Sequence, residues 1–209
     1  MPGYLLPTFF ITSADPAVVA FAREAVGDEV DERERAVRLY YAVRDEVRYD
    51  PWSIRLTPEG FTASRCLAER RGFCIPKATL LAAVARASGI PARLGFADVR
   101  NHLAPPRLAE VMGGVSDYLW HAYTELLVEG RWVKVTPAFN RELCERFRVA
   151  PLEFDGRTDS LFQPFNDDQR PFMEYVRDRG SFDDVPFDEI AADFRAHHGA
   201  WLSASNGLA

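Results

Sequence analysis

The chain has 209 residues, a hydrophobic fraction of 47% and a formal net charge of −6 at pH 7. This length suits one domain with a substantial core, and the acidic balance argues against nucleic acid or an anionic membrane as the main partner. The three cysteines, Cys66, Cys74 and Cys144, form no close pair, which favours free thiols in a reducing compartment. We expect a cytoplasmic protein, because the N-terminal apolar run lacks a basic leading region and no stretch reaches the roughly 20 apolar residues of a membrane span.

The first third of the chain is mainly helical in pattern. Residues 4–12 are expected to form a short strand or pairing arm. Asp15, as a cap, predicts a helix over 16–26, and apolar residues at helical spacing predict a second helix over 31–47. A shorter helix is expected over 62–70, after a loop that contains Pro and Gly.

Cys74 stands where a loop becomes a helix. Gly72 lets the backbone bend just before it, and Pro76 suits a first helical turn. The run from Cys74 to Ser88 is rich in Ala, Leu and Val on nearly every side, which predicts a buried helix that Gly89 ends. A cysteine at a helix N-terminus faces unpaired N–H groups and the positive end of the helix dipole, which both favour the nucleophilic thiolate. A small core residue is the alternative interpretation.

The second half of the chain carries the strand signals. Residues 92–99 alternate enough to predict a strand, and the stretch 100–116, rich in Pro and Gly, predicts a loop. Residues 120–128 and 131–136 flank Glu129-Gly130 and predict a β-hairpin.

The pattern weakens after this hairpin. Residues 140–148 are expected to be helical, and 149–187 are expected to form a long wrapping segment. A last helix is expected over 187–198, followed by a loose tail.

The hairpin register places His121 and Thr136 on one face. With a two-residue turn, Glu125 meets Lys134 as an opposite-charge pair, and Thr136 lies diagonal to His121. A nucleophilic thiolate needs an imidazole within about 3 Å to take and return a proton, and that imidazole needs a third polar group on its other nitrogen. Cys74, His121 and Thr136 are therefore the candidate catalytic residues. A buried histidine satisfied by its neighbours is the alternative for His121.

Four segments in this order carry a family resemblance: residues 36–49, the nucleophile helix with its exit at 71–93, His121-Ala-Tyr-Thr-Glu125, and Gly130-Arg-Trp-Val133 with Thr136-Pro137. Together they resemble the transglutaminase-like superfamily, a branch of the papain-like cysteine enzymes, over about residues 33–140. The resemblance implies an α+β fold with a papain-like or transglutaminase-like core, in which a helical N-terminal part and the nucleophile helix pack on an antiparallel β-sheet. Residues 1–209 are then a single domain, with 141–209 as a C-terminal extension wrapping the core.

The resemblance also implies a Cys-His-Asp triad, with Cys74 as nucleophile and His121 as base. The implied activity is acyl transfer through a thioester on an amide or peptide-like substrate. The acceptor is water in a protease-like or amidase-like hydrolysis, or an amine in a transglutaminase-type transfer. The backbone N–H of Cys74 would help to hold the oxyanion. Tyr49, Trp52 or Trp120 would complete that hole, line the cleft or belong to the core.

The third triad position departs from the family pattern, because the family's Asp falls on Thr136. Either Thr136 orients the imidazole, or Asn140, Asp98 or Asp155 substitutes, or activity is lost. Lys77 also departs from the residues usual after the cysteine, and it either adds positive charge near the thiolate or reaches solvent.

A catalytically weak or inactive binding module, using the same cleft for a peptide or small amide, is the alternative function. No cofactor and no metal is expected, because no Cys or His pair shows ligand spacing. The expected partner is a peptide, protein or small amide substrate, with no nucleic acid and no membrane. The sequence gives no indication of oligomeric state.

Overall fold

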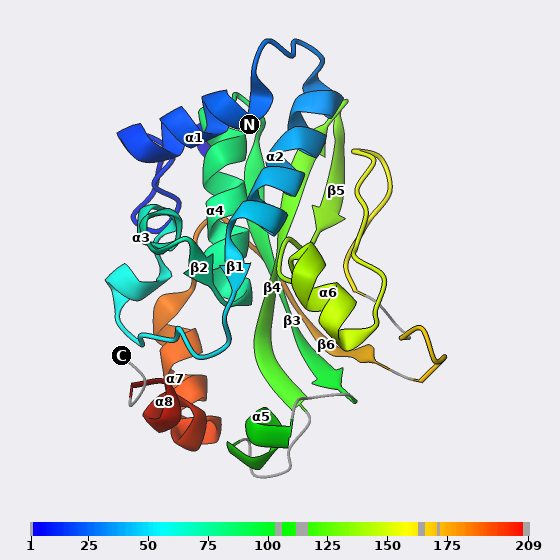
Figure 1. The fold of residues 1–209 in the computed structure, drawn as a ribbon. Coiled ribbons are helices and arrows are strands. Elements are labelled where there is room, and N and C mark those ends of the chain that lie inside the picture. The colour runs from blue at the N-terminus through cyan, green and yellow to red at the C-terminus, as the bar shows by residue number, and fades with distance from the viewer. Residues whose placement is uncertain (1, 103–105, 112–116, 163–165, 171, 207–209) are drawn as a thin grey trace.

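The computed structural model describes residues 2–102, 106–111, 117–162, 166–170 and 172–206. Its helices are η1 (Pro2–Leu5), α1 (Pro16–Val26), α2 (Glu32–Glu46), η2 (Pro58–Phe61), α3 (Ala63–Glu69), α4 (Cys74–Ala87), α5 (Pro106–Val111), α6 (Arg141–Phe147), α7 (Phe187–His197) and α8 (Gly199–Asn206). Its strands are β1 (Arg48–Tyr49), β2 (Arg71–Gly72), β3 (Ala92–Asn101), β4 (Asp117–Val128), β5 (Arg131–Val135) and β6 (Met173–Phe182). The predicted α+β class is confirmed (Figure 1).

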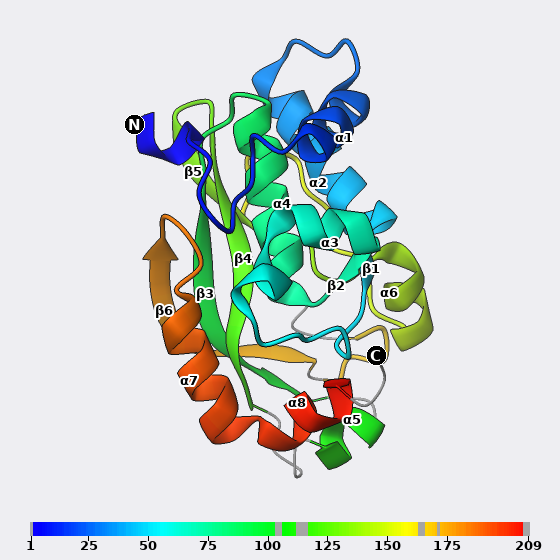
Figure 2. The same cartoon turned by 90° about the vertical axis from the view of Figure 1, so that its left-hand side faces the viewer.

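The main sheet is antiparallel and has four strands in the order β5-β4-β3-β6. Helices α1 to α4 lie on one side of the long strands β3 and β4 (Figure 2). Helix α4 is central, because it contacts β3, β4 and the other three helices. Every residue of α4 from Ile75 to Arg86 is buried, which confirms the predicted buried helix. The largest cluster of buried apolar side chains lies between this helix and the sheet.

The first two helices begin where the sequence predicts. Asp15 Oδ1 accepts the backbone N–H groups of Ala17 and Val18, at 2.9 and 3.2 Å, and so caps α1. Asp31 caps α2 in the same way through the N–H of Glu34, at 2.9 Å. These local bonds satisfy N–H groups that have no partner within the helix.

The β4–β5 hairpin also has the predicted register. Glu129 and Gly130 have φ of +50° and +79° and form the two-residue turn, and Glu125 lies opposite Lys134. The ion pair of Glu125 is different from the one predicted. Its carboxylate binds Arg93 of β3 at 2.6 Å, because Arg93 is its partner on the other side.

Four parts of the chain differ from the sequence-based expectation, and one of them is the tail, which was expected to be loose but contains α8. Residues 4–12 form no strand, since they contain the end of η1 and then irregular backbone. The expected loop 100–116 contains α5, and the expected wrapping segment 149–187 contains β6. Strand β6 is largely polar, but it lies at a sheet edge, where backbone pairing with β3 holds it and charged side chains are tolerated.

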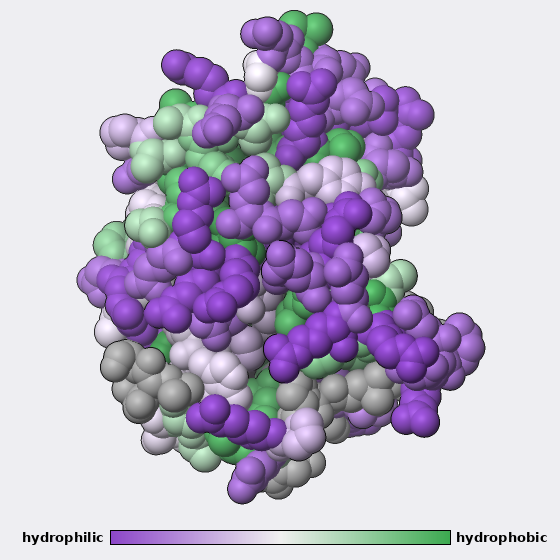
Figure 3. Space-filling view, in the orientation of Figure 1, coloured by the Kyte–Doolittle hydropathy of each residue, from purple (hydrophilic) through white to green (hydrophobic). Residues whose placement is uncertain are grey.

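The molecular surface is mostly hydrophilic on the face that Figure 3 shows. Hydrophilic residues cover most of the face seen in Figure 3, and apolar residues reach it in small patches between them. Among the described helices, none combines the length and the apolar character needed to cross a membrane.

Candidate active site

Cys74 is the first residue of α4 and is half-buried. The two residues before Phe73 form β2, which pairs in parallel with β1 and sets Tyr49 opposite Gly72. Gly72 is closely packed, because a Cβ there would lie 2.9 Å from Cys66 Sγ. The short parallel pair therefore fixes the chain at the point where α4 begins.

His121 lies in β4, opposite Ala97 of β3, and is 7% exposed. Just before His121 the register of the two strands shifts between Ala97 and Val99, and Trp120 has a φ of +60°. Such a β-bulge changes the direction of the neighbouring side chains. A positive φ is unfavourable for a bulky residue, so the contacts around Trp120 have to hold it there.

Trp120 is held from three directions. Its backbone N–H donates to Asp98 Oδ1 at 3.1 Å, and its indole N–H donates to Asp193 Oδ2 at 2.8 Å. The guanidinium of Arg179 lies 4.2 Å from the ring centroid and pairs with both acids, at 2.6 Å to Asp98 and 3.0 Å to Asp193. Because Arg179 belongs to β6 and Asp193 to α7, the last third of the chain fixes the backbone that precedes His121.

Cys74 and His121 line the same pocket, which has an empty volume of about 770 Å³ with its open mouth included. The other described residues lining it are Tyr49, Pro51, Phe73, Val99, Asn101, Leu108, Tyr118, Leu119, Phe139, Leu143, Phe147, Phe172, Met173, Phe194 and Trp201. Within this described lining no side chain is Asp, Glu, Lys or Arg. Elsewhere among the described residues, too, no three His, Cys, Asp or Glu side chains cluster in a way that could hold a metal ion.

Burial favours the neutral forms of both the Cys74 thiol and the His121 imidazole. Burial raises the pKa of the Cys74 thiol to about 11, although the backbone N–H groups of Ala122, Ile75 and Cys74 itself favour the thiolate. Burial also lowers the pKa of His121 to about 4. The N–H groups at the start of α4 thus favour the thiolate as expected, but loss of hydration outweighs them, and the net shift of the pKa is upward.

Thr136 was expected to orient the imidazole, and it does share a small cavity with His121. Its Oγ1 is buried, however, and has no hydrogen-bond partner among the described residues. A threonine hydroxyl is one bond closer to the backbone than a carboxylate oxygen of Asp, which explains why it does not reach the ring. The hydrogen bond expected between Thr136 and His121 is thus absent.

The three substitutes considered for this position have other partners. Asn140 Oδ1 accepts the backbone N–H of Tyr49 at 3.1 Å. Asp98 is bound to Arg179 at 2.6 Å, and Asp155 accepts two N–H groups of its own turn at 2.7 and 2.8 Å. In the described part of the chain, none of these side chains is recorded as bonded to the imidazole.

Lys77 fits neither of its two expectations, because it is fully buried and its ammonium group faces the end of α2. Nζ donates to the backbone carbonyl of Arg44 at 2.9 Å and to that of Val47. Burial lowers the pKa of Lys77 to about 7, and the thiols that it influences are Cys66 and Cys144 rather than Cys74. Lys77 therefore caps a helix next to the site.

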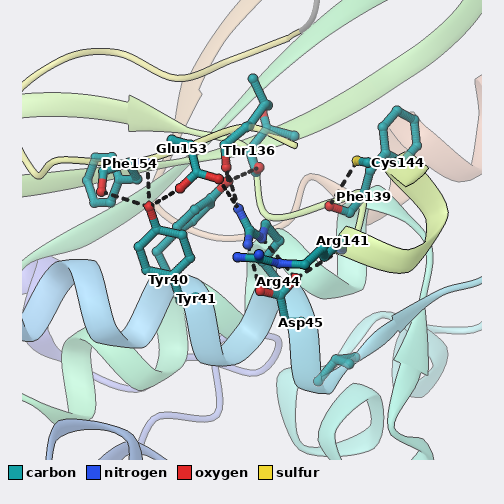
Figure 4. Close-up of polar contacts among 12 residues, drawn as sticks. Tyr40, Tyr41, Arg44, Asp45, Thr136, Phe139, Arg141, Cys144, Glu153 and Phe154 are labelled. Atoms are coloured by element: carbon teal, nitrogen blue, oxygen red, sulfur yellow. Dashed lines mark hydrogen bonds and ion pairs between the residues drawn. The ribbon is translucent and has the colours of Figure 1, made fainter. Parts of the chain in front are cut away.

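Behind Thr136, a buried arginine of α2 organises the chain (Figure 4). Arg44 donates to the carbonyl of Leu152 at 2.6 Å and binds the carboxylate of Asp45 at 2.6 and 2.9 Å. The Tyr40 hydroxyl donates to the same Leu152 carbonyl at 2.8 Å and lies 3.5 Å from that of Thr136. These bonds fix the backbone around Thr136 without engaging its side chain.

The three aromatic residues considered for the cleft lie in different places. Tyr49 lines the pocket beside Cys74. Trp120 is buried at the bulge, and Trp52 packs on the core with the Arg107 guanidinium 5.1 Å from its ring centroid.

Sequence reasoning missed much of the pocket wall. Leu143 and Phe147 come from α6, Phe172 precedes β6, and Trp201 comes from α8. The only available signal was the spacing of Leu143 and Phe147, four residues apart on one helix face.

Comparison with known proteins adds the following. The model of the transglutaminase-like superfamily matches residues 19–137. A proposed cysteine protease from Cytophaga hutchinsonii has a similar structure, with 23% identity, a TM-score of 0.50, and coverage of 64% of this chain and 40% of that one. The periplasmic domain of TgpA from Pseudomonas aeruginosa has 24% identity and a TM-score of 0.44, with coverage of 65% of this chain and 45% of that one. The matched part is thus less than half of either structure, and no curated protein matches the chain.

Proposed function

Because this chain belongs to the transglutaminase-like superfamily, we propose that it transfers an acyl group from an amide or peptide-like substrate to water, through a thioester on Cys74. One observation carries the proposal: the thiol of Cys74 and the imidazole of His121 line one pocket. A nucleophile and a base on the same cavity are the minimum that covalent acyl transfer needs.

The neutral state of both groups sets the first step. The Cys74 sulfur attacks the substrate carbonyl while His121 takes the thiol proton, so the charge separates only as the carbon–sulfur bond forms. His121 then gives that proton to the leaving amine, and the thioester remains. In the second step water attacks the thioester, His121 transfers the proton from water to the sulfur, and a carboxylic acid leaves.

The backbone N–H groups near the sulfur support the same mechanism. The N–H groups of Cys74, Ile75 and Ala122 all favour negative charge at Sγ. A carbonyl oxygen attacked from this sulfur develops its negative charge nearby. Donors fixed by a helix start and a strand need no reorganisation when that charge forms.

The first test is alkylation by iodoacetamide at near-neutral pH. Cys74 should react much faster than Cys66 and Cys144, because it is half-buried and they are buried. His121→Ala should slow the reaction of Cys74 at least about tenfold, since the base that takes the thiol proton is removed. An unchanged rate in His121→Ala would contradict a catalytic pair.

The matching activity test uses Cys74→Ala against a panel of fluorogenic amides. Turnover should fall on the order of a thousandfold or more. Cys144→Ala is the control, because it truncates a thiol outside the pocket lining and should keep its activity.

The pH dependence of kcat/KM tests whether Cys74 and His121 react from their neutral forms. With the pKa of His121 at about 4 and that of Cys74 at about 11, kcat/KM should stay level from pH 8 down to pH 5. Below that it should fall as His121 gains a proton. An acid limb at pH 6 to 7 would show that the imidazole titrates near its ordinary pKa.

A binding module without chemistry is the second candidate, and the unpartnered hydroxyl of Thr136 favours it. Without a third group on His121, the orientation of the ring depends on packing alone. Equal alkylation of Cys74 in the wild type and in His121→Ala, together with no turnover, would support this alternative.

A further inference from the structure

We propose that the pocket beside Cys74 and His121 selects substrates by a bulky apolar group on the acyl side, such as an aromatic or branched aliphatic side chain. This inference rests on the proposed acyl transfer and adds the class of substrate to it. It follows from the apolar walls of the pocket and from a tyrosine hydroxyl there that has no hydrogen-bond partner among the described residues.

The walls are made of rings that fix one another. Phe139 stacks on Phe172 with centroids 6.0 Å apart, and the edge of Tyr49 meets Phe139 at 4.8 Å. Tyr118 and Trp201 form a further edge-to-face pair at 6.0 Å. Such contacts hold a preformed apolar surface, which gains free energy when another apolar group covers it.

Polar groups are scarce in the described lining. The Tyr118 hydroxyl is buried and has no hydrogen-bond partner among the described residues, so it can donate to one substrate carbonyl. Among the described residues of the lining there is no charged side chain that could neutralise a charged acyl group. A carboxylate, an ammonium or a carboxamide placed there would lose its hydration without full replacement.

The extent of the apolar wall agrees with a large occupant. Apolar and aromatic residues from several elements line the pocket, so an acetyl or alanyl group would leave most of this wall uncovered, and an aromatic or leucine-sized group would cover more of it.

Part of the wall comes from the last third of this chain. Leu143, Phe147, Phe172 and Trp201 all lie beyond residues 19–137, the part that matches the family model. In Figures 1 and 2, α6 lies beside the lower part of α4, and α5 and α8 lie below the point where α4 begins. The proposed reactive pair thus lies in the part that matches the family model, and some of the apolar wall lies in segments beyond it.

The test is a matched series of blocked amino-acid amides of one fluorescent amine, with Phe, Leu, Gln, Glu or Lys as the acyl residue. The wild-type protein should cleave the Phe and Leu amides with a kcat/KM about 10- to 100-fold above that of the Gln, Glu and Lys amides. Leu143→Arg, at a half-buried wall position, should lower the ratio of Phe to Glu cleavage at least tenfold. Val30→Arg is the matched control, since Val30 is 88% exposed outside the pocket lining, and it should leave the ratio unchanged.

The outcomes separate this inference from the proposed function. Cleavage that prefers the Gln, Glu or Lys amide would overturn the apolar preference and leave acyl transfer standing. If no amide is cleaved and no acyl group is found on Cys74 by mass spectrometry, the proposed function fails. The affinity of Cys74→Ala for the same five amides then decides the preference: tighter binding of Phe and Leu supports it, and equal binding overturns it.

Discussion

The start of α4 and the bulged stretch of β4 bring the two reactive side chains to one pocket by different means. Cys74 is placed mostly by its sequence neighbours, through the glycine before it and a helix that begins at it. His121 is placed by residues 23 and 72 positions away, because Asp98 and Asp193 hold Trp120 at its unusual φ. The base therefore depends on the assembled fold much more than the nucleophile does.

This difference explains what could be predicted. A helix start and a hairpin are set by nearby residues, so the bounds of α4 and the register of β4 with β5 follow from the pattern. The bulge before His121 needs Arg179 from β6, and no local signal marks an edge strand with so many charged residues. Loss of hydration at Cys74 is likewise a property of the packed pocket, and the helix N-terminus alone gave the wrong direction for its pKa.

The largest effect is expected for a variant that misplaces His121 and leaves Cys74 in position. Arg179→Ala removes both ion pairs and the stacking on Trp120, so kcat should fall about 10- to 100-fold through a misplaced His121, with little change in KM. Arg179→Lys should recover part of kcat, since one ion pair can re-form. Steady-state kinetics with the best amide substrate measure both values.

Arg177→Ala is the control on the same strand, because the Arg177 side chain is exposed and no ion pair with Asp98 or Asp193 is recorded for it within the described residues. An equal fall in kcat for Arg177→Ala would show a general effect of charge near the site instead of positioning. The alkylation rate of Cys74 in Arg179→Ala should fall with kcat, because the same imidazole takes the thiol proton.

The second effect is a change in stability with pH, and it is caused by Lys77 of α4, the helix that begins at Cys74. The pKa of Lys77 is lowered from its ordinary 10.5 to about 7 in the folded protein, so between pH 7 and 8 the unfolded chain binds more protons at this group. The free energy of unfolding should therefore rise with pH across this window, by about 1 kcal/mol. Urea unfolding at pH 7, 7.5 and 8 measures this rise.

Lys77→Met should remove this rise. Lys134→Met, which changes the other lysine of the chain, should keep the rise. The window ends at pH 8 because above it ionisation of the three cysteine thiols in the unfolded chain lowers the stability and opposes the effect of Lys77. A rise that persists in Lys77→Met would show that another group causes it.

The smallest effect is expected at Thr136, the third residue of the expected triad. Thr136→Val replaces a hydroxyl without a partner by a methyl of similar size, so activity should stay within about twofold and stability should be equal or up to about 1 kcal/mol higher. Thr124→Val is the matched control, since Thr124 Oγ1 donates to the carbonyl of Ala78 at 2.9 Å. It should lose about 1–2 kcal/mol.

A tenfold loss of activity in Thr136→Val at unchanged stability would contradict this reading. It would mean that the hydroxyl reaches His121 during the reaction. Chemical denaturation and kinetics on the two variants decide the matter together.

The dependence of the bulge on β6 and α7 has a consequence for biosynthesis. A nascent chain that has emerged only as far as β5 already contains the cysteine and the complete helix that presents it. Arg179, which binds the bulge, is made about 60 residues after His121, and Asp193 of α7 is made later still. The proposed base thus gains the contacts that fix its backbone only after α7 has been made, later than the proposed nucleophile gains its helix.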